Sequence, residues 1–186
     1  MTATQIRIQK VSLIFRTLFQ ILLVAVPIVH ILAWVHAPQA IDVSGKFGFI
    51  VSVVPKGVIV LHPLSISTKI YGFLVGAIPL IMIEFILYYL IRLFKLYAGG
   101  EIFSALNVNY IKKIGYFMLL VQIASIISNG ILSFILTWGN PHGHRYIILT
   151  IQGLNITVIL TAFLIILISW IMAEGCRLRE EQQLTI

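Results

Sequence analysis

Long apolar segments separated by short polar ones dominate this chain. Four of them are almost free of Lys, Arg, Asp and Glu, and each reaches the roughly 20 residues that a helix needs to cross about 30 Å of hydrocarbon. We predict membrane spans at about residues 14–36, 68–93, 110–138 and 147–173. They take up most of the 186 residues, so the sequence predicts one membrane domain, an all-α, antiparallel four-helix transmembrane bundle.

The polar segments between the spans are an outer loop at residues 37–66, an inner loop at 96–106 and an inner tail at 174–186. In the inner loop, Gly99-Gly100 is typical of a helix end, because glycine adopts the left-handed C-cap conformation at little cost. Ser104 is a favourable N-cap for the next helix. Such a short link predicts that the second and third helices are antiparallel neighbours.

The outer loop contains two β-branched runs on either side of Pro55-Lys56-Gly57. A short glycine-containing link between such runs indicates a hairpin, so we expect small strands at about Phe47–Val54 and Gly57–His62. A lone hairpin is marginal in water and must lean on other surfaces. It can be an edge for a ligand or partner, or a lid packed over the helix ends, and the lid is the interpretation we favour.

The basic residues suggest an orientation for the chain. With both termini in the cytoplasm, nine Lys and Arg lie inside and four lie outside, as the positive-inside rule prefers. Charged residues make up only 10% of the chain, and its net charge of +7 is explained by attraction of juxtamembrane cations to anionic lipid. The bilayer is therefore the expected partner of the basic residues, and direct nucleic-acid binding is not expected.

One acid, Glu84, lies inside a predicted span, where a charge is costly. At its depth the third helix offers Gln122, which we predict as its hydrogen-bond partner, with Arg16 or Gln20 as alternatives. Glu84 is then either a proton or cation site or, as we favour, a protonated acid that links helices.

A second polar level lies nearer the outer surface. Counting residues from the inner helix ends places His30, Asn129 and Asn155 at a similar depth. Gly72 and Gly76 form a GxxxG pair at that level, which permits close helix approach and self-association. Pro27 and Pro79 lie nearby, and we expect them to leave backbone carbonyls free for polar partners. This layer is packing glue or, alternatively, a transport site.

Other chemistry is not indicated by the sequence. There is no nucleophile–base pair, phosphate-binding loop or metal-ligand cluster, so we predict no enzyme, cofactor or metal site. His142 and His144 lack a nearby carboxylate or cysteine to complete a metal site. Cys176 is the single cysteine, which excludes an intramolecular disulfide.

Several separated motifs resemble a known family. They are LYAGGEIFSALNV, WGNPHG, PLS before the second span, and the tail EGCRLREEQQLTI. Together they are similar to a bacterial family of four-span membrane proteins catalogued as domain of unknown function 2975. Its usual inner and tail patterns read like LYxxGEIFTxENV and EGxxLREENELTV. This chain differs at Leu106, Gln182 and Gln183, and these changes remove acidic character.

The resemblance implies a multi-pass protein of the bacterial cytoplasmic membrane with no family catalytic residues. Family members are often encoded beside a small helix-turn-helix regulator, which suggests that the inner face anchors or restrains such a protein. The candidate contact residues are Glu101, Phe103, Asn107, Lys112, Arg177, Leu178, Arg179, Glu180 and Glu181. The alternative function is a transport or channel subunit that uses Glu84, Gln122, His30, Asn129 and Asn155. Self-association into a homo-oligomer is a further expectation.

Overall fold

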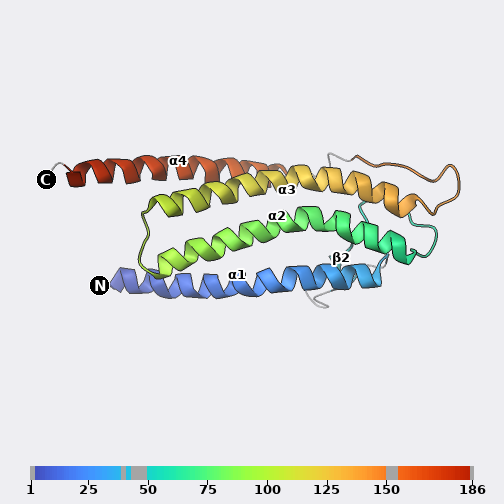
Figure 1. The fold of residues 1–186 in the computed structure, drawn as a ribbon, viewed down its shortest axis with the longest axis horizontal. Helices are drawn as coiled ribbons and strands as arrows, with labels where there is room; N and C mark the ends of the chain where they lie inside the picture. The colour runs from blue at the N-terminus through green and yellow to red at the C-terminus, as the bar shows by residue number, and fades with distance from the viewer. Residues whose placement is uncertain (1–2, 39–40, 43–49, 150–154, 185–186) are drawn as a thin grey trace. The chain divides into compact units, whose positions relative to one another are not determined.

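Four long α-helices make up most of a computed structural model of the chain (Figure 1). The structure describes residues 3–38, 41–42, 50–149 and 155–184. The helices are α1 (Ala3–His36), α2 (Ile66–Ala98), α3 (Ala105–Thr137) and α4 (Ile156–Leu184). Two short strands, β1 (Ile41–Asp42) and β2 (Ile50–Val51), pair in antiparallel fashion between α1 and α2.

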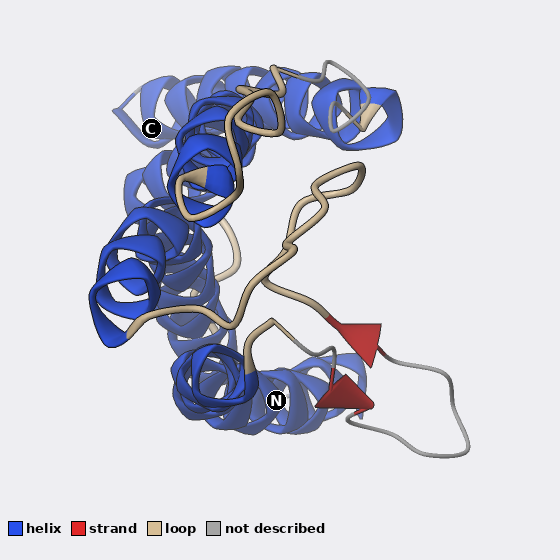
Figure 2. Ribbon diagram, turned by 90° about the vertical axis from the view of Figure 1, so that its right-hand side faces the viewer, coloured by secondary structure: helices blue, strands red, loops and turns tan. Residues whose placement is uncertain are grey.

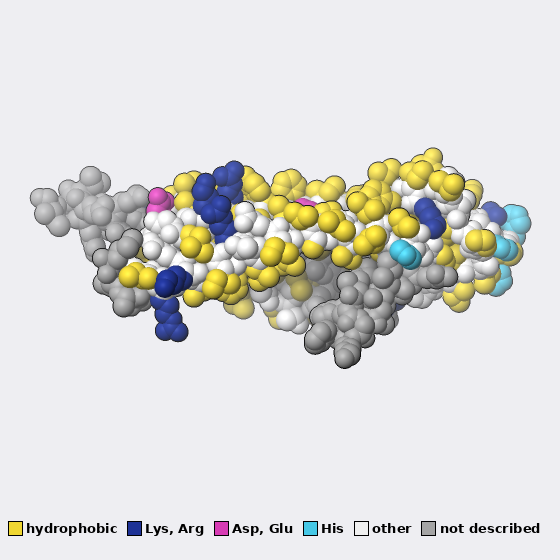
Figure 3. Space-filling view, turned by 90° about the horizontal axis from the view of Figure 1, so that it is seen from below, with side chains coloured by type: hydrophobic (Ala, Val, Ile, Leu, Met, Phe, Trp, Pro, Cys, Tyr) yellow, Lys and Arg dark blue, Asp and Glu magenta, His cyan; other side chains and the backbone are white. Residues whose placement is uncertain are grey.

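All four helices are long and apolar enough to span a membrane. Over the described side chains, these helices are Gln5–His36, Ile66–Ala98, Ala105–Thr137 and Ile156–Leu178, and each contains an 18-residue apolar window. Many of their large hydrophobic side chains are exposed, and hydrophobic side chains cover much of the face seen in Figure 3. Exposed apolar surface of this extent is expected where lipid rather than water is the solvent. The chain is therefore a multi-pass membrane protein with four helices, as predicted.

The chain divides into two compact units. Unit 1 consists of Met1–Val24, Met82–Leu120 and Asn155–Ile186, and unit 2 of Ala25–Ile81 and Val121–Leu154. In unit 1 the start of α1, the end of α4 and the α2–α3 connection lie at the same end (Figure 1). Unit 2 contains the long connection between α1 and α2 and the connection between α3 and α4 up to Leu154.

The predicted outer hairpin is wrong. Within the described part of its range, residues 50–51 are strand β2, but they pair with β1 and not with residues 57–62. Residues 52–62 form turns and irregular backbone, and Figure 2 shows this segment as a loop. Its residues 47–49 lie outside the described part of the chain. A turn does form at the expected place, where the amide of Val58 donates to the carbonyl of Pro55. Residues 57–62, the second β-branched run, are nevertheless not paired with a strand in the described part of the chain.

Side chains of the α3–α4 connection take the place of that partner strand. The amide of Ile59 donates to the hydroxyl of Tyr146 at 2.8 Å, and the amide of Leu61 donates to Oδ1 of Asn140 at 3.1 Å. Asn140 Nδ2 returns a 2.9 Å bond to the carbonyl of Ile59. Because these bonds satisfy the backbone, the loop needs no ladder.

The valines of this loop form a lid over the helices of unit 2. A buried cluster there contains Trp34 and Ala37 with Leu132 and Leu136 of α3. Partly buried side chains of the loop pack against it, namely Val53, Val54, Val58, Val60 and Leu64. The apolar run therefore serves packing, in agreement with the lid interpretation.

Helix α4 begins later than the predicted span start at residue 147. Residues 146–149 are irregular and are tied to side chains of α3. The amide of Ile148 donates to Ser133 Oγ at 2.8 Å, and Thr137 Oγ1 donates to the carbonyl of Tyr146 at 3.2 Å. These bonds hold the segment extended against α3, so its apolar residues do not join α4.

Candidate functional site

The α2–α3 connection has the helix ends that the sequence predicts. Gly100 has a φ of 87°, and its amide donates to the backbone carbonyl of Tyr97. The amide of Glu101 donates to the carbonyl of Leu96 at 3.0 Å. This pattern is a Schellman motif, which ends α2. Ser104 Oγ then accepts a 3.3 Å bond from the amide of Asn107, so Ser104 caps α3 as predicted.

Asn107 holds this connection from within. Its side chain is fully buried, and its Nδ2 donates to the carbonyl of Glu101 at 2.6 Å. It was a candidate contact residue, but a buried side chain bonded to its own loop is not available to a partner. The structure instead gives Asn107 the role of fixing the backbone that presents Glu101 and Phe103.

Those two side chains point into open surroundings. Glu101 is exposed and Phe103 is 63% exposed, although a free aromatic ring gains by burial. Lys112, another candidate, is half-buried, and its Nζ lies 5.8 Å from the ring centre of Tyr116. Lys113 makes a similar contact, 5.0 Å from the ring centre of Tyr89. Unit 1 therefore presents an exposed acid and an exposed aromatic ring in the α2–α3 connection, and two lysines that lie over tyrosine rings.

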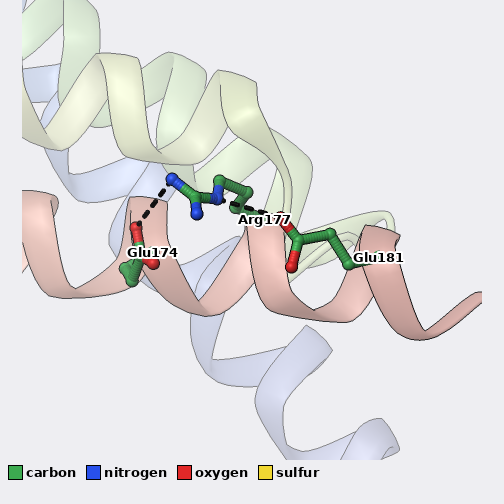
Figure 4. Close-up of polar contacts among 3 residues, drawn as sticks. All are labelled: Glu174, Arg177 and Glu181. Atoms are coloured by element: carbon green, nitrogen blue, oxygen red, sulfur yellow. Dashed lines mark hydrogen bonds and ion pairs between the residues drawn. The ribbon is translucent and has the colours of Figure 1, made fainter.

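The charged tail that follows Ala173 is helical to Leu184. Figure 4 shows Glu174, Arg177 and Glu181 on this helix. Arg177 lies between two acids, with Nε 3.1 Å from Glu181 Oε1 and a guanidinium nitrogen 3.8 Å from Glu174 Oε2. Leu178 is 51% exposed beside them. Arg179 and Glu180 belong to the same helix, but their side chains lie outside the described ones.

A cavity of about 230 Å³ lies beside the connection in unit 1. It is lined by the start of α1 and the end of α2: Gln5, Ile8, Gln9, Tyr97, Gly99, Gly100 and Ile102. The lining has no cationic or anionic side chain. It offers amide and phenol groups on an apolar floor, directly beside Glu101.

Unit 2 contains a second polar cavity, of about 210 Å³. It brings together His30 from α1, Gly76 and Pro79 from α2, and Asn129 from α3, as the predicted polar layer requires. Its other lining residues are Ala33, Trp34, Ser52, Val53, Ser125, Ser128 and Leu132. The serines of α3 and the loop residue Ser52 were not predicted as members.

The GxxxG pair accommodates aromatic side chains. A Cβ on Gly72 would lie 2.1 Å from Cη2 of Trp34, and a Cβ on Gly76 would lie 3.1 Å from Cε1 of His30. The ring of His30 also approaches Phe73, with its Nε2 3.3 Å from that residue's carbonyl oxygen. Because both positions are glycines, the rings of Trp34 and His30 in α1 can pack directly against the backbone of α2.

Pro79 has the predicted effect on a carbonyl. Proline has no N–H, so the carbonyl of Val75, four residues earlier, has no helical donor. Ser128 Oγ of α3 donates to it at 2.8 Å, and the Ser128 side chain is buried. The presence of Pro79 inside a predicted span indicated that a carbonyl would be free for such a bond. The sequence did not identify Ser128 as the donor.

The remaining intramembrane candidates have different surroundings. Asn155 is not in the cavity: it caps α4, since the amide of Val158 donates to its Oδ1 at 3.4 Å. Glu84 Oε1 and Arg16 Nε are buried without a hydrogen-bond partner among the described residues. The hydrogen bond predicted between Glu84 and Gln122 stays a prediction.

Metal-binding groups are not clustered in the described part of the chain. No group of three or more His, Cys, Asp and Glu side chains there is placed to hold an ion. His142 and His144 are exposed, in the turn between α3 and α4.

Residues 21–186 match the family model described as "Protein of unknown function (DUF2975)". This range covers α2, α3 and α4, the α2–α3 connection and the tail, together with the second half of α1 from residue 21. Comparison with curated proteins and with solved structures gave no match.

Proposed function

Because the chain belongs to the DUF2975 family, a family of unknown function, we propose a function from its surfaces: it is a membrane interaction protein that anchors or restrains a small cytoplasmic helix-turn-helix regulator. The contact surface is the exposed part of the α2–α3 connection together with the tail of α4. We name this surface, formed by Glu101, Phe103, Arg177, Leu178 and Glu181, the docking surface.

The helical tail is the observation that carries this proposal. The apolar run of α4 ends at Ala173, yet the helix continues to Leu184 through mostly charged and polar residues. This helical segment is supported by Arg177, which lies between two acids at helical spacings of three and four residues. A tail that is already helical loses less conformational entropy when it binds a partner.

The chemistry of the docking surface suits a protein partner. Phe103 and Leu178 are large apolar side chains that would gain by burial, and aromatic residues are typical anchors in interface centres. Glu101 and Glu181 supply exposed carboxylates that can accept hydrogen bonds from a cationic side chain of a partner on contact. Nucleic-acid-binding regulators are commonly basic, so these acids can meet the partner's cations.

The proposal places both termini in the cytoplasm of a bacterial cell. Four spans put both termini on one side, and the distribution of Lys and Arg supports the cytoplasmic side. The docking surface then faces soluble cytoplasmic proteins. Homo-oligomers are compatible with this arrangement, because the exposed helix faces can meet a second copy.

Co-purification tests the proposal. The partners to use are candidate small helix-turn-helix regulators, extracted in mild detergent with the full chain or with a form lacking residues 174–186. We expect a regulator to co-purify with the full chain, and its recovery with the shortened form to be at least tenfold lower. A control with Ile59→Ala and Leu61→Ala, exposed positions of unit 2, should recover as much as the full chain. Equal recovery from the shortened form would argue against the tail.

A transport or channel subunit is the alternative function. It is favoured by the polar cavity that contains His30 and Asn129, and by Glu84, whose Oε1 is buried without a partner among the described residues. Proton or solute flux into vesicles should fall with Glu84→Gln if this alternative holds. Unchanged flux would remove Glu84 from a transport role.

A further inference from the structure

We propose that the cavity of unit 2 is a binding site for a small neutral molecule that carries one hydrogen-bond-accepting oxygen, such as an alcohol or ketone. Neither the family description nor the docking surface assigns this site. The proposal does not depend on the proposed regulator, because it concerns residues of unit 2 alone.

The indole N–H of Trp34 has no hydrogen-bond acceptor among the described residues. Trp34 lines the cavity and is 4% exposed, and its Nε1 has no hydrogen-bond partner among the described residues. A buried donor without a partner costs about 1–3 kcal/mol relative to a satisfied one, so such atoms are uncommon unless something else supplies the acceptor. An oxygen of a bound molecule would supply it.

Gly76 lies beside that donor, and both residues line the cavity. A Cβ on Gly76 would lie 3.4 Å from Trp34 Nε1 and 3.1 Å from His30 Cε1. We name the position of this Cβ the Gly76 notch. A methyl group at the notch would crowd the indole N–H, whereas glycine places no side chain there. The ligand oxygen would reach the N–H from the cavity that both residues line.

The lining determines the charge of the ligand. None of the lining residues is Lys, Arg, Asp or Glu, so an ion entering the cavity would lose hydration without meeting an opposite charge. Asn129, Ser52 and Ser125 offer further neutral donors and acceptors. A neutral polar molecule is therefore favoured over a carboxylate or an ammonium ion.

The volume and the apolar walls determine the ligand's size. The cavity of about 210 Å³ equals the volume of about seven water molecules at about 30 Å³ each. Ala33, Val53 and Leu132 supply an apolar wall. A ring or short chain with one oxygen fits this combination, whereas a lipid tail offers no acceptor to the indole.

Indole NMR signals provide the test. The full chain is labelled with ¹⁵N at its tryptophans, placed in nanodiscs and titrated with cyclohexanone. Trp34→Phe identifies the Trp34 signal, and the exposed Trp138 and Trp170 are internal controls for partitioning into lipid. Methylcyclohexane has the same number of non-hydrogen atoms but no oxygen, and cyclohexanecarboxylate adds a charge.

We expect a saturable shift of the Trp34 signal with cyclohexanone and none with the two analogues. Gly76→Ala fills the notch and should weaken binding at least tenfold, while Gly139→Ala, with nothing within 4 Å of its Cβ position, should bind like the parent. Saturation transfer to the ligand, measured on Trp34→Phe, gives a second estimate and should show binding about tenfold weaker, since one hydrogen bond is lost. An unmoved Trp34 signal, equal shifts with methylcyclohexane, or unchanged affinity in both variants would overturn the proposal.

Discussion

Ser128 donates a 2.8 Å hydrogen bond to the carbonyl of Val75, the carbonyl that Pro79 leaves without a helical donor. A defect in the hydrogen bonding of α2 is thereby repaired by a side chain of α3. Within unit 2 this bond ties the two helices together at the cavity wall, since Ser128 and Pro79 both line it.

Replacing Ser128 with alanine should therefore destabilise the protein by about 1 kcal/mol, in the range for hydrogen bonds between membrane helices. The loss should be smaller when Pro79→Ala is also present, because alanine at this position restores a backbone N–H for the Val75 carbonyl. Reversible unfolding in mixed micelles measures all four members of this double-mutant cycle. Thr161→Val is the control, since the Thr161 hydroxyl bonds only within its own helix. Additive losses would show that Ser128 does not compensate for the proline.

Two glycine substitutions should have opposite effects on stability. Gly100 has a φ of 87°, a conformation that costs an L-residue about 1 kcal/mol, so Gly100→Ala should lower the free energy of unfolding by about that amount. Gly175 lies inside α4 with nothing within 4 Å of its Cβ position. Gly175→Ala should therefore raise stability by about 0.5–1 kcal/mol. The same unfolding assay compares them, and equal effects would contradict the helix-end assignment.

Asn107 should control the order of the connection. Asn107→Ala removes the donor to the Glu101 carbonyl and should cost about 1–2 kcal/mol. The amides of residues 99–104 should then exchange with deuterium several-fold faster, as mass spectrometry of the detergent-solubilised protein can show. Asn109, two positions on, is exposed, so Asn109→Ala is the matched control. Unchanged exchange in Asn107→Ala would mean that the helix caps alone order this segment.

The four helices and the caps at Gly100 and Ser104 could be predicted because they depend on local properties. Hydropathy over a long window identifies a span whatever it packs against. A left-handed glycine and a serine N-cap satisfy backbone groups within a few residues. Pro79 is a similar case, because its missing N–H leaves a carbonyl free in any setting.

The hairpin and the start of α4 could not be predicted, because distant side chains decide both. Val58 and Val60 have the composition of a strand, but Asn140 and Tyr146 take the neighbouring backbone hydrogen bonds. Residues after 146 are apolar enough for a span, but Ser133 and Thr137 hold them against α3. The N-cap position of Asn155 follows from the late helix start. The lack of a partner for Trp34 Nε1 likewise depends on its three-dimensional surroundings near Gly76, which the sequence does not give.

Cys176 can report the side of the membrane on which the tail lies. It is the only cysteine and is partly exposed, so the unmodified chain carries a single site for a membrane-impermeant maleimide. We expect labelling in inverted vesicles and little in intact spheroplasts, because the tail is proposed to be cytoplasmic. Gly139→Cys combined with Cys176→Ala places the thiol in the α3–α4 turn and should reverse the pattern. Labelling of Cys176 from outside would place the docking surface away from cytoplasmic partners.

The most direct measurement of the docking surface is photo-crosslinking in living cells. A benzophenone amino acid replaces Phe103, which is 63% exposed, or Ile59, which is equally exposed at 63% in unit 2. We expect a covalent product with a small helix-turn-helix regulator from position 103 and none from position 59, with the product reduced when residues 174–186 are removed. Products of equal yield from both positions, or none from position 103, would contradict the proposed docking surface.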